Sequence, residues 1–208
     1  MTSEQSARYR EEAHELRRAG EFEAAGNLYT RAAFEGLGVN EFTLGNTSRY
    51  LRPLLSAATC YRLAGDERTC RYRCQVGALL AEEIGERLLA RSTPENAYDN
   101  ARRGAWFEFV GDFRLLGGLD GADDAYERAK EIYREAGDPE TADSEVVHGV
   151  LLGYFYDVAA AVGHDTETFN LEVSLRYPFS EWVEYKQAYL PDLLDTLFEQ
   201  GEWVWEDT

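Results

Sequence analysis

A helical pattern that stops at a glycine and restarts within about five residues occurs three times in this chain, and it constrains the fold more than any other feature. In the first copy, apolar residues at helical spacing run up to "RRAG", and a second helical pattern, "EFEAAGNLYTRAA", follows at once. Gly20 is suited to end the first helix because glycine adopts the left-handed conformation without steric cost. Two helices joined by so short a turn form an antiparallel hairpin. We therefore expect an all-α fold.

The pattern returns in "LLSAATCYRLAGDERTCRYRCQVGALLAEE", with a turn at Gly65, and in "WFEFVGDFRLLGGLDGADDAYERAKEIYREAGD", with a turn near Gly117. Residues 93–95 (Thr-Pro-Glu) and 138–140 (Asp-Pro-Glu) predict helix starts, since a capping side chain precedes proline and an acid. The segment "VVHGVLLGYFYDVAAAVG" is apolar nearly all round, which predicts a buried central or capping helix.

The three units resemble tetratricopeptide (TPR) hairpins, in which small residues let adjacent helices approach closely and aromatic residues fill the space beside them. The matching residues are Tyr9, Ala13, Leu16, Gly20, Phe22, Ala25, Tyr29 and Ala32 in the first unit, Leu54, Ala57, Ala58, Tyr61, Gly65, Cys70, Cys74 and Gly77 in the second, and Trp106, Phe109, Phe113, Gly117, Leu119, Ala122, Tyr126 and Ala129 in the third. The turn glycines are farther apart than the family repeat of about 34 residues. The units are therefore more similar to irregular, long-helix relatives such as the SNAP-type adaptors. An ordinary helical bundle is the alternative, since bundles also carry alanine and aromatic stripes.

The resemblance implies a right-handed stack of antiparallel helical hairpins, with about eight or nine helices in the whole chain. We assign residues 1–162 to this array and residues 163–208 to a less regular extended segment and capping helix of the same compact domain. Apolar residues alternate over residues 166–176, which predicts a strand or an extended loop. The stretch "SEWVEYKQAYLPDLLDTLFEQG" predicts one helix bent at Pro191, or two helices that meet there.

The charge balance is unusual, with 39 acidic against 21 basic residues and a net charge of −18. Lys130 and Lys186 are the only lysines, so nearly every basic residue is arginine. Excess carboxylates with almost no lysine are typical of salt-accumulating halophiles, whose proteins stay in solution through a hydrated, self-repelling surface. A merely acidic protein is the alternative, but acidity alone does not explain the missing lysines. So acidic a chain argues against binding a nucleic-acid backbone, which needs a basic face.

The compartment follows from the start of the chain and from its cysteines. The polar start "MTSEQSARYREE" does not resemble a secretion signal, and no apolar run is long enough to span a bilayer. Cys60, Cys70 and Cys74 are an odd set, so we expect reduced thiols and a cytoplasmic protein. Their spacing differs from that of common zinc modules, so we interpret them as core residues, with a metal or redox site as the alternative.

No motif in the chain supports catalysis or a bound cofactor. His14, His148 and His164 are scattered and lie in no metal-binding frame, and there is no nucleophile elbow, P-loop or dinucleotide fingerprint. We expect a protein that is not an enzyme and that uses no cofactor.

One set of basic residues suggests a binding surface. Alignment on the turn glycines places Arg17, Arg62 and Arg114 at one position, three residues before Gly20, Gly65 and Gly117. In TPR-like packing the first helices of the hairpins line a concave groove, where guanidinium groups can bind carboxylates with bidentate geometry. The residues that would extend this surface are Arg10, Arg18, Arg52, Tyr61 and Phe107. Structural ion pairing of each arginine with a neighbouring acid is the alternative.

Two functions from different classes follow. The first is a non-enzymatic adaptor that binds an acidic segment or a C-terminal carboxylate of a protein or peptide in the concave groove. The second is a thiol-based metal or redox sensor built on Cys60, Cys70 and Cys74. The oligomeric state stays open, with a dimer among the options.

Overall fold

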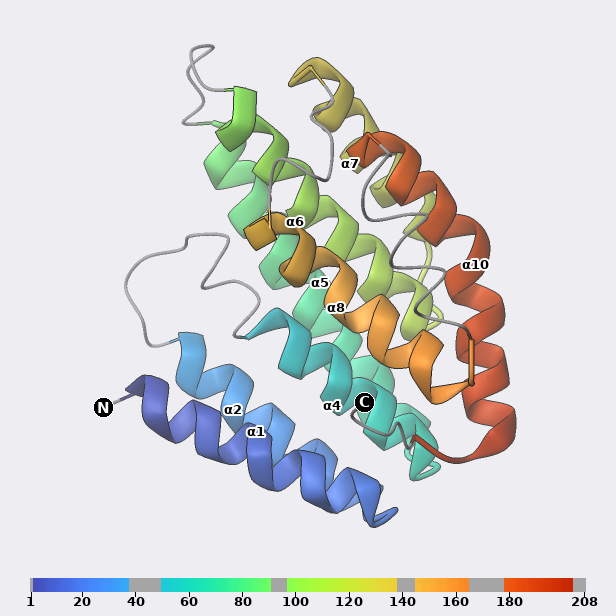
Figure 1. Cartoon of the computed structure of the whole chain (residues 1–208). Helices are drawn as coiled ribbons and strands as arrows, with labels where there is room; N and C mark the ends of the chain where they lie inside the picture. The colour runs from blue at the N-terminus through green and yellow to red at the C-terminus, as the bar shows by residue number, and fades with distance from the viewer. Residues whose placement is uncertain (1, 38–49, 91–96, 138–144, 165–177, 204–208) are drawn as a thin grey trace.

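The protein is all-helical, as the repeated pattern predicts. The structure, a computed structural model, describes residues 2–37, 50–90, 97–137, 145–164 and 178–203 (Figure 1). These parts of the chain contain eight helices and no β-strand. The helices are α1 (Thr2–Arg18), α2 (Phe22–Leu37), α4 (Leu51–Leu63), α5 (Glu67–Leu89), α6 (Ala97–Leu116), α7 (Ala122–Glu135), α8 (Glu145–Ala161) and α10 (Phe179–Gln200). The strand expected at 166–176 and the helix starts expected at 93–95 and 138–140 lie outside the described residues.

The first six helices form three hairpins that pack in chain order. Helix α1 packs on α2, α2 on α4, α4 on α5, α5 on α6 and α6 on α7. Figure 1 shows this succession as a stack that runs from the blue hairpin α1–α2 to α7. The expected stack of antiparallel helical hairpins is therefore confirmed.

Each hairpin turns at a glycine with positive φ, which is the conformation that other residues rarely adopt. These glycines are Gly20 (φ 75°), Gly65 (φ 78°) and Gly118 (φ 56°). In each turn the glycine N–H donates to the carbonyl three residues earlier, and the next N–H donates to the carbonyl five residues before it. This pair of bonds satisfies carbonyls that the helix end would leave without partners. The third turn glycine is therefore Gly118, one residue later than the expected Gly117.

Neighbouring helices approach closely wherever a glycine on one helix lies under an aromatic ring from the next. A Cβ at Gly104 would lie 2.5 Å from the Tyr133 ring, and one at Gly111 would lie 2.5 Å from the Tyr126 ring. The other pairs of this kind are Gly26 with Tyr61, Gly77 with Phe113 and Gly85 with Phe107. Small residues thus admit the aromatic side chains that fill the core, as expected from the TPR-like pattern. Ala122 matches the pattern in sequence but is only half-buried, whereas Ala125 and Ala129 are buried.

The last two helices occupy different places. Helix α10 packs mainly on α7 and so continues the stack, running unbroken from Phe179 to Gln200 with Pro191 inside it. Helix α8 contacts α4, α6 and α10. Because α4 and α6 are the first helices of successive hairpins and touch each other, α8 lies on the face they share, which we call the inner face. Figure 1 shows α8 between α4 and α6 and in front of α5.

The position of α8 explains its composition. Among its described side chains, Tyr154, Phe155, Val158 and Ala159 are all fully buried. The Tyr154 hydroxyl lies 2.8 Å from Thr59 Oγ1 on α4, so its polar atom has a partner. The buried central helix predicted for this segment is present. None of the described helices combines the length and the apolar character needed to cross a bilayer.

Candidate functional site: a cationic pocket on the inner face

A pocket of about 200 Å³ opens beside α8, where α1, α2 and α4 meet it. Its lining residues are Arg10, His14, Tyr29, Arg52, Pro53, Ser56 and Asp157. Arg10 and His14 lie one turn apart on α1, and Arg52 and Ser56 lie one turn apart on α4. Each pair therefore lies on one side of its helix. Two arginines and three neutral polar side chains converge on this hollow, whose one acid is Asp157, in a protein of net charge −18.

His14 is a partly buried histidine with several arginines nearby. Burial and the nearby arginines, with Arg17 and Arg52 the nearest in effect, lower the pKa of His14 from 6.5 to about 4. The ring is therefore neutral at pH 7, with one nitrogen that donates and one that accepts. His14 Nδ1 lies 2.9 Å from the Tyr29 hydroxyl, which holds the ring in place. A group that carries a negative charge would relieve the repulsion that keeps His14 neutral.

Arg52 fixes α8 against α4 at the other side of the pocket. Its Nη2 donates to both Asp157 carboxylate oxygens, at 3.1 and 2.9 Å, and to the Gly153 carbonyl at 3.2 Å. The guanidinium lies over the backbone of Gly153, where any side chain would collide with it. Burial raises the pKa of Asp157, and Arg52 opposes that effect. Arg52 thus has a structural partner but still contributes a wall of the pocket.

The arrangement suits the binding of a small anionic group. The N–H groups of arginine and the hydroxyls of Tyr29 and Ser56 are donors that match carboxylate oxygens. A cavity of about 200 Å³ has room for one carboxylate-bearing side chain or chain end but not for a folded surface.

Of the residues proposed from sequence, Arg10 and Arg52 meet in this pocket. His14, Tyr29, Ser56 and Asp157 were missed. A signal for them existed in the spacing Arg10–His14 and Arg52–Ser56, because residues four apart share a helix face. The sequence does not show where α8 packs, and it is this packing that brings Asp157 to the pocket.

The shared register of Arg17, Arg62 and Arg114 requires a correction. Because Gly118 and not Gly117 makes the third turn, the residue equivalent to Arg17 and Arg62 is Leu115. Arg114 lies one position earlier and donates to the Gly121 carbonyl at 3.1 Å and to Glu82 Oε2 at 3.2 Å.

Arg17 and Arg62 are equivalent, and both contact the C-terminal part of the chain. The Arg17 guanidinium lies 4.6 Å from the Trp203 ring centroid, and the Arg62 guanidinium lies 4.0 Å from that of Phe198. Arg17 is 1% exposed. Such cation–π contacts attach the end of α10 and the residues after it to the first two hairpins. These two arginines therefore stabilise the chain's own packing.

The two aromatic residues suggested as partner anchors are core side chains. Tyr61 is 3% exposed and donates to Asn27 Oδ1, while Phe107 is 5% exposed and lies against Gly85. Arg18 is exposed at the end of α1.

The three cysteines are free and buried. Cys70 and Cys74 lie one turn apart on α5, and burial raises the pKa of Cys60 to about 12. Among the described residues, no three His, Cys, Asp or Glu side chains come together as they would to hold a metal ion.

A buried charged cluster, absent from the sequence analysis, joins α10 to α6 and α7. Lys186 Nζ contacts Glu108 Oε1 and Asp112 Oδ2, both at 2.7 Å, and all three side chains are at most 1% exposed. Tyr133 donates to Glu108 and Tyr126 to Asp112. These partners satisfy the buried charges, so the cluster clamps the helices together.

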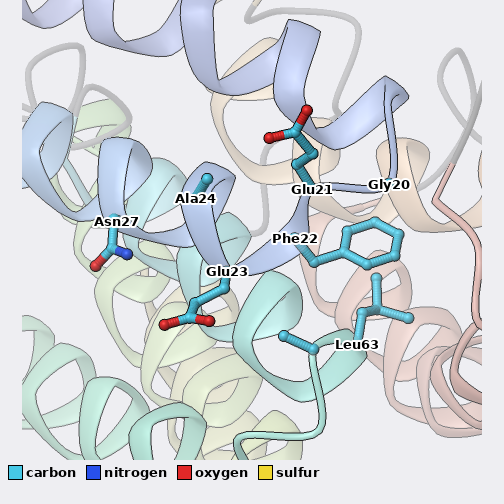
Figure 2. Close-up of a pocket in the computed structure, with 8 residues that line it drawn as sticks. Gly20, Glu21, Phe22, Glu23, Ala24, Asn27 and Leu63 are labelled. Carbon is cyan, nitrogen blue, oxygen red and sulfur yellow. The ribbon is translucent and has the colours of Figure 1, made fainter.

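A second, wider hollow of about 620 Å³ lies at the turn of the first hairpin, next to the end of α4. Figure 2 shows Phe22 and Leu63 close together in it, while the carboxylates of Glu21 and Glu23 point away from each other. This hollow is open and acidic like most of the molecule. The cationic pocket is therefore the more distinctive feature.

Comparison with family models, with curated proteins and with solved structures gave no match for this chain. The class of the protein consequently rests on its own architecture, which is an all-α stack of antiparallel helical hairpins.

Proposed function

We propose that this chain is a non-enzymatic, TPR-like adaptor that binds a carboxylate of a partner protein or peptide in the cationic pocket. The hairpin architecture supports the TPR-like class, since each second helix packs on the first helix of the next hairpin. The lengths of α5 (23 residues) and α6 (20 residues) favour the irregular, long-helix type that includes SNAP-like adaptors. Stacks of this kind present extended surfaces, and binding is their usual role.

The observation that carries the proposal is the local reversal of charge. In a protein of net charge −18, Arg10 and Arg52 both line this pocket. Burial lowers the pKa of His14, and the charges of the nearby arginines lower it further. An acidic group would gain charge-assisted hydrogen bonds at this place. Because α8 covers the inner face of α4 and α6, we place the partner at the open end beside α1 and not along the whole groove.

The proposed setting is a salt-rich cytoplasm. Three free cysteines fit a reducing compartment, and a lysine-poor acidic surface fits high salt. In such salt, long-range attraction is screened over a few ångströms. Recognition would then depend on short contacts inside a shielded pocket, which the site offers.

The test uses labelled hexapeptides that carry Asp or Glu at the last two positions and a free carboxyl terminus, with fluorescence anisotropy in molar KCl. Arg10→Gln should weaken binding about ten- to a hundredfold, because one charge-assisted hydrogen bond contributes about 1.5–3 kcal/mol. Arg31→Gln is the matched control, because Arg31 is exposed on α2 and does not line the pocket. Amidated peptides with Asn and Gln in place of the acids should not bind. Equal binding by the wild type and Arg10→Gln would contradict the proposal.

A further inference from the structure

The chain that leaves α10 meets α1 and α8 beside the cationic pocket. Gly201 ends α10 with a φ of 68°, and its N–H donates to the Leu197 carbonyl. Two residues later, Trp203 is fully buried. Its indole Nε1 donates to the Asp157 carbonyl on α8 at 3.3 Å, and its ring centroid lies 4.6 Å from the Arg17 guanidinium at the end of α1. Trp203 therefore anchors the chain between α1 and α8.

Asp157 connects this anchor directly to the pocket. Its backbone carbonyl accepts the hydrogen bond from Trp203, while its carboxylate binds Arg52 in the pocket wall. Arg17, which contacts the Trp203 ring, also acts on the pocket. Burial lowers the pKa of His14 to about 4, and Arg17 is the first of the nearby charges that add to this effect. The anchor and the pocket thus share Asp157 and lie on either side of Arg17.

The residues that follow Trp203 carry the chemistry that the pocket suits. Residues 204–208 read Val-Trp-Glu-Asp-Thr, with adjacent carboxylates at Glu206 and Asp207. They lie beyond the described part of the chain, but the chain length from the anchor limits their reach, and three extended residues span about 10 Å. Because Asp157 both holds Trp203 and lines the pocket, this span is enough to bring Glu206 to the pocket.

We propose that Glu206 and Asp207 occupy the cationic pocket of their own chain and compete there with the carboxylate of the partner. This inference rests on the proposed function of the pocket, to which it adds self-inhibition. The two carboxylates accept charge-assisted hydrogen bonds from Arg10 and Arg52, which line the pocket. A partner has to displace this acidic segment before its own carboxylate can bind.

The covalent connection makes a weak contact effective. A segment held by a short linker is present at its site at an effective concentration in the millimolar range. Molar salt screens long-range attraction but does not change the length of the linker, so this effective concentration persists. A partner binds only the fraction of pockets that the segment leaves open, and its apparent affinity falls by that fraction. A segment that fills about two thirds to nine tenths of the pockets weakens the partner about three- to tenfold.

The experiment repeats the anisotropy titration of the acidic hexapeptide in molar KCl with the wild type and two variants of the whole chain. The test variant combines Glu206→Gln with Asp207→Asn, which keeps the size of both side chains and removes their charge. The control variant combines Asp195→Asn with Glu199→Gln, which removes the same charge from exposed acids of α10. The test variant should bind the peptide about three- to tenfold more tightly than the wild type, and the control variant should match the wild type.

A second measurement needs no peptide. The NMR signals of the His14 imidazole and of Arg10 Nε–H are compared among the three free proteins at pH 7. If the acidic segment fills the pocket, both signals differ between the wild type and the test variant, whereas the control variant matches the wild type. These differences should be independent of protein concentration, because the contact lies within one chain.

The outcomes separate self-inhibition from the proposed function. Equal peptide affinities of the wild type and the test variant would overturn self-inhibition and leave the proposed function intact. If none of the three proteins binds the peptide, the proposed function fails and the free proteins decide the inference. Unchanged His14 and Arg10 signals then overturn it, and changed signals support a pocket filled by the segment. Signal differences that grow with protein concentration also overturn it, because they place the segment of a second copy in the pocket.

Discussion

At the scale of single residues, the most unusual feature is the pair of carboxylates that share Lys186 in the core. Burial raises the pKa of Asp112 to about 6, against the attraction of Lys186 and with a further contribution from Glu108. The charged partners and their hydrogen bonds raise the pKa of Lys186, against burial. The lysine therefore keeps its charge, while the proton on Asp112 depends on pH in the mildly acidic range.

We predict that this proton makes folding stability fall between about pH 4 and pH 6. The folded protein binds the Asp112 proton more tightly than the unfolded chain, so the contribution is complete below the unfolded pKa and is lost as pH rises through the folded value. Two pKa units correspond to about 3 kcal/mol. Urea unfolding in molar KCl should show a smaller fall for Asp112→Asn than for the wild type over this window. Parallel curves for the two proteins would contradict this account, because the other acids contribute equally to both.

This cluster also shows where sequence reasoning stops. Glu108 and Asp112 lie one turn apart on α6 among apolar residues, and the structure shows that both are buried. In a chain with 39 acidic residues, however, such pairs occur everywhere and carry no signal. Their partner Lys186 is far away in the sequence, and only the packing of α10 on α6 and α7 brings them together.

At the scale of helices, close contact depends on glycines that accept an aromatic ring. Tyr133 and Tyr126 lie over Gly104 and Gly111 of α6, and their hydroxyls are bound to Glu108 and Asp112. Each ring is therefore held at both its face and its hydroxyl. It cannot turn aside without breaking a buried hydrogen bond.

We predict that Gly104→Ala and Gly111→Ala each destabilise the protein by about 1–2 kcal/mol. Overpacking costs about 1–3 kcal/mol, which exceeds the gain of about 1 kcal/mol in helix propensity. Gly26→Ala is the graded control, because its Cβ would lie 3.2 Å from Tyr61, where a shift of a few tenths of an ångström suffices. Denaturant melts measure all three. An unchanged or higher stability of Gly104→Ala would show that the tyrosine rings are not fixed.

The helices themselves were largely predictable, and their final arrangement was not. The first hairpin has the expected boundaries because its periodic apolar positions and Gly20 act locally. The third turn was misplaced by one residue because Gly117 and Gly118 are adjacent, and only the hydrogen-bond pattern distinguishes them. The position of α8 could not be predicted, because a helix that is apolar nearly all round does not indicate which helices it will pack against.

At the scale of the whole molecule, the most unusual feature is the excess of acidic over basic side chains. Lys186 and Lys130, the only lysines, are 0% and 5% exposed. Lys130 Nζ is held by Glu127 Oε1 and Gln187 Oε1. Every exposed basic side chain of the chain is therefore an arginine or a histidine, and acidic side chains outnumber them. The halophile interpretation rests on this surface.

We predict that the melting temperature rises markedly as KCl increases from millimolar to molar concentrations. Salt screens the repulsion among carboxylates, which destabilises the compact state at low ionic strength. Thermal scans that follow helical circular dichroism measure the effect, with a neutral osmolyte at equal osmolality as the control. A melting temperature that does not change with KCl would remove the argument for a high-salt setting.

The most direct test of the central claim is to locate a bound acidic peptide by NMR at pH 7 in molar KCl. The tightest of the acidic hexapeptides is titrated into labelled protein, and the His14 imidazole and Arg10 Nε–H signals are followed, with exposed His164 as the internal reference. The account predicts saturable shifts at His14 and Arg10 with the same midpoint as the anisotropy titration, and none at His164. Binding that leaves His14 and Arg10 unchanged and shifts residues on α5 or α7, which do not line the pocket, would contradict it.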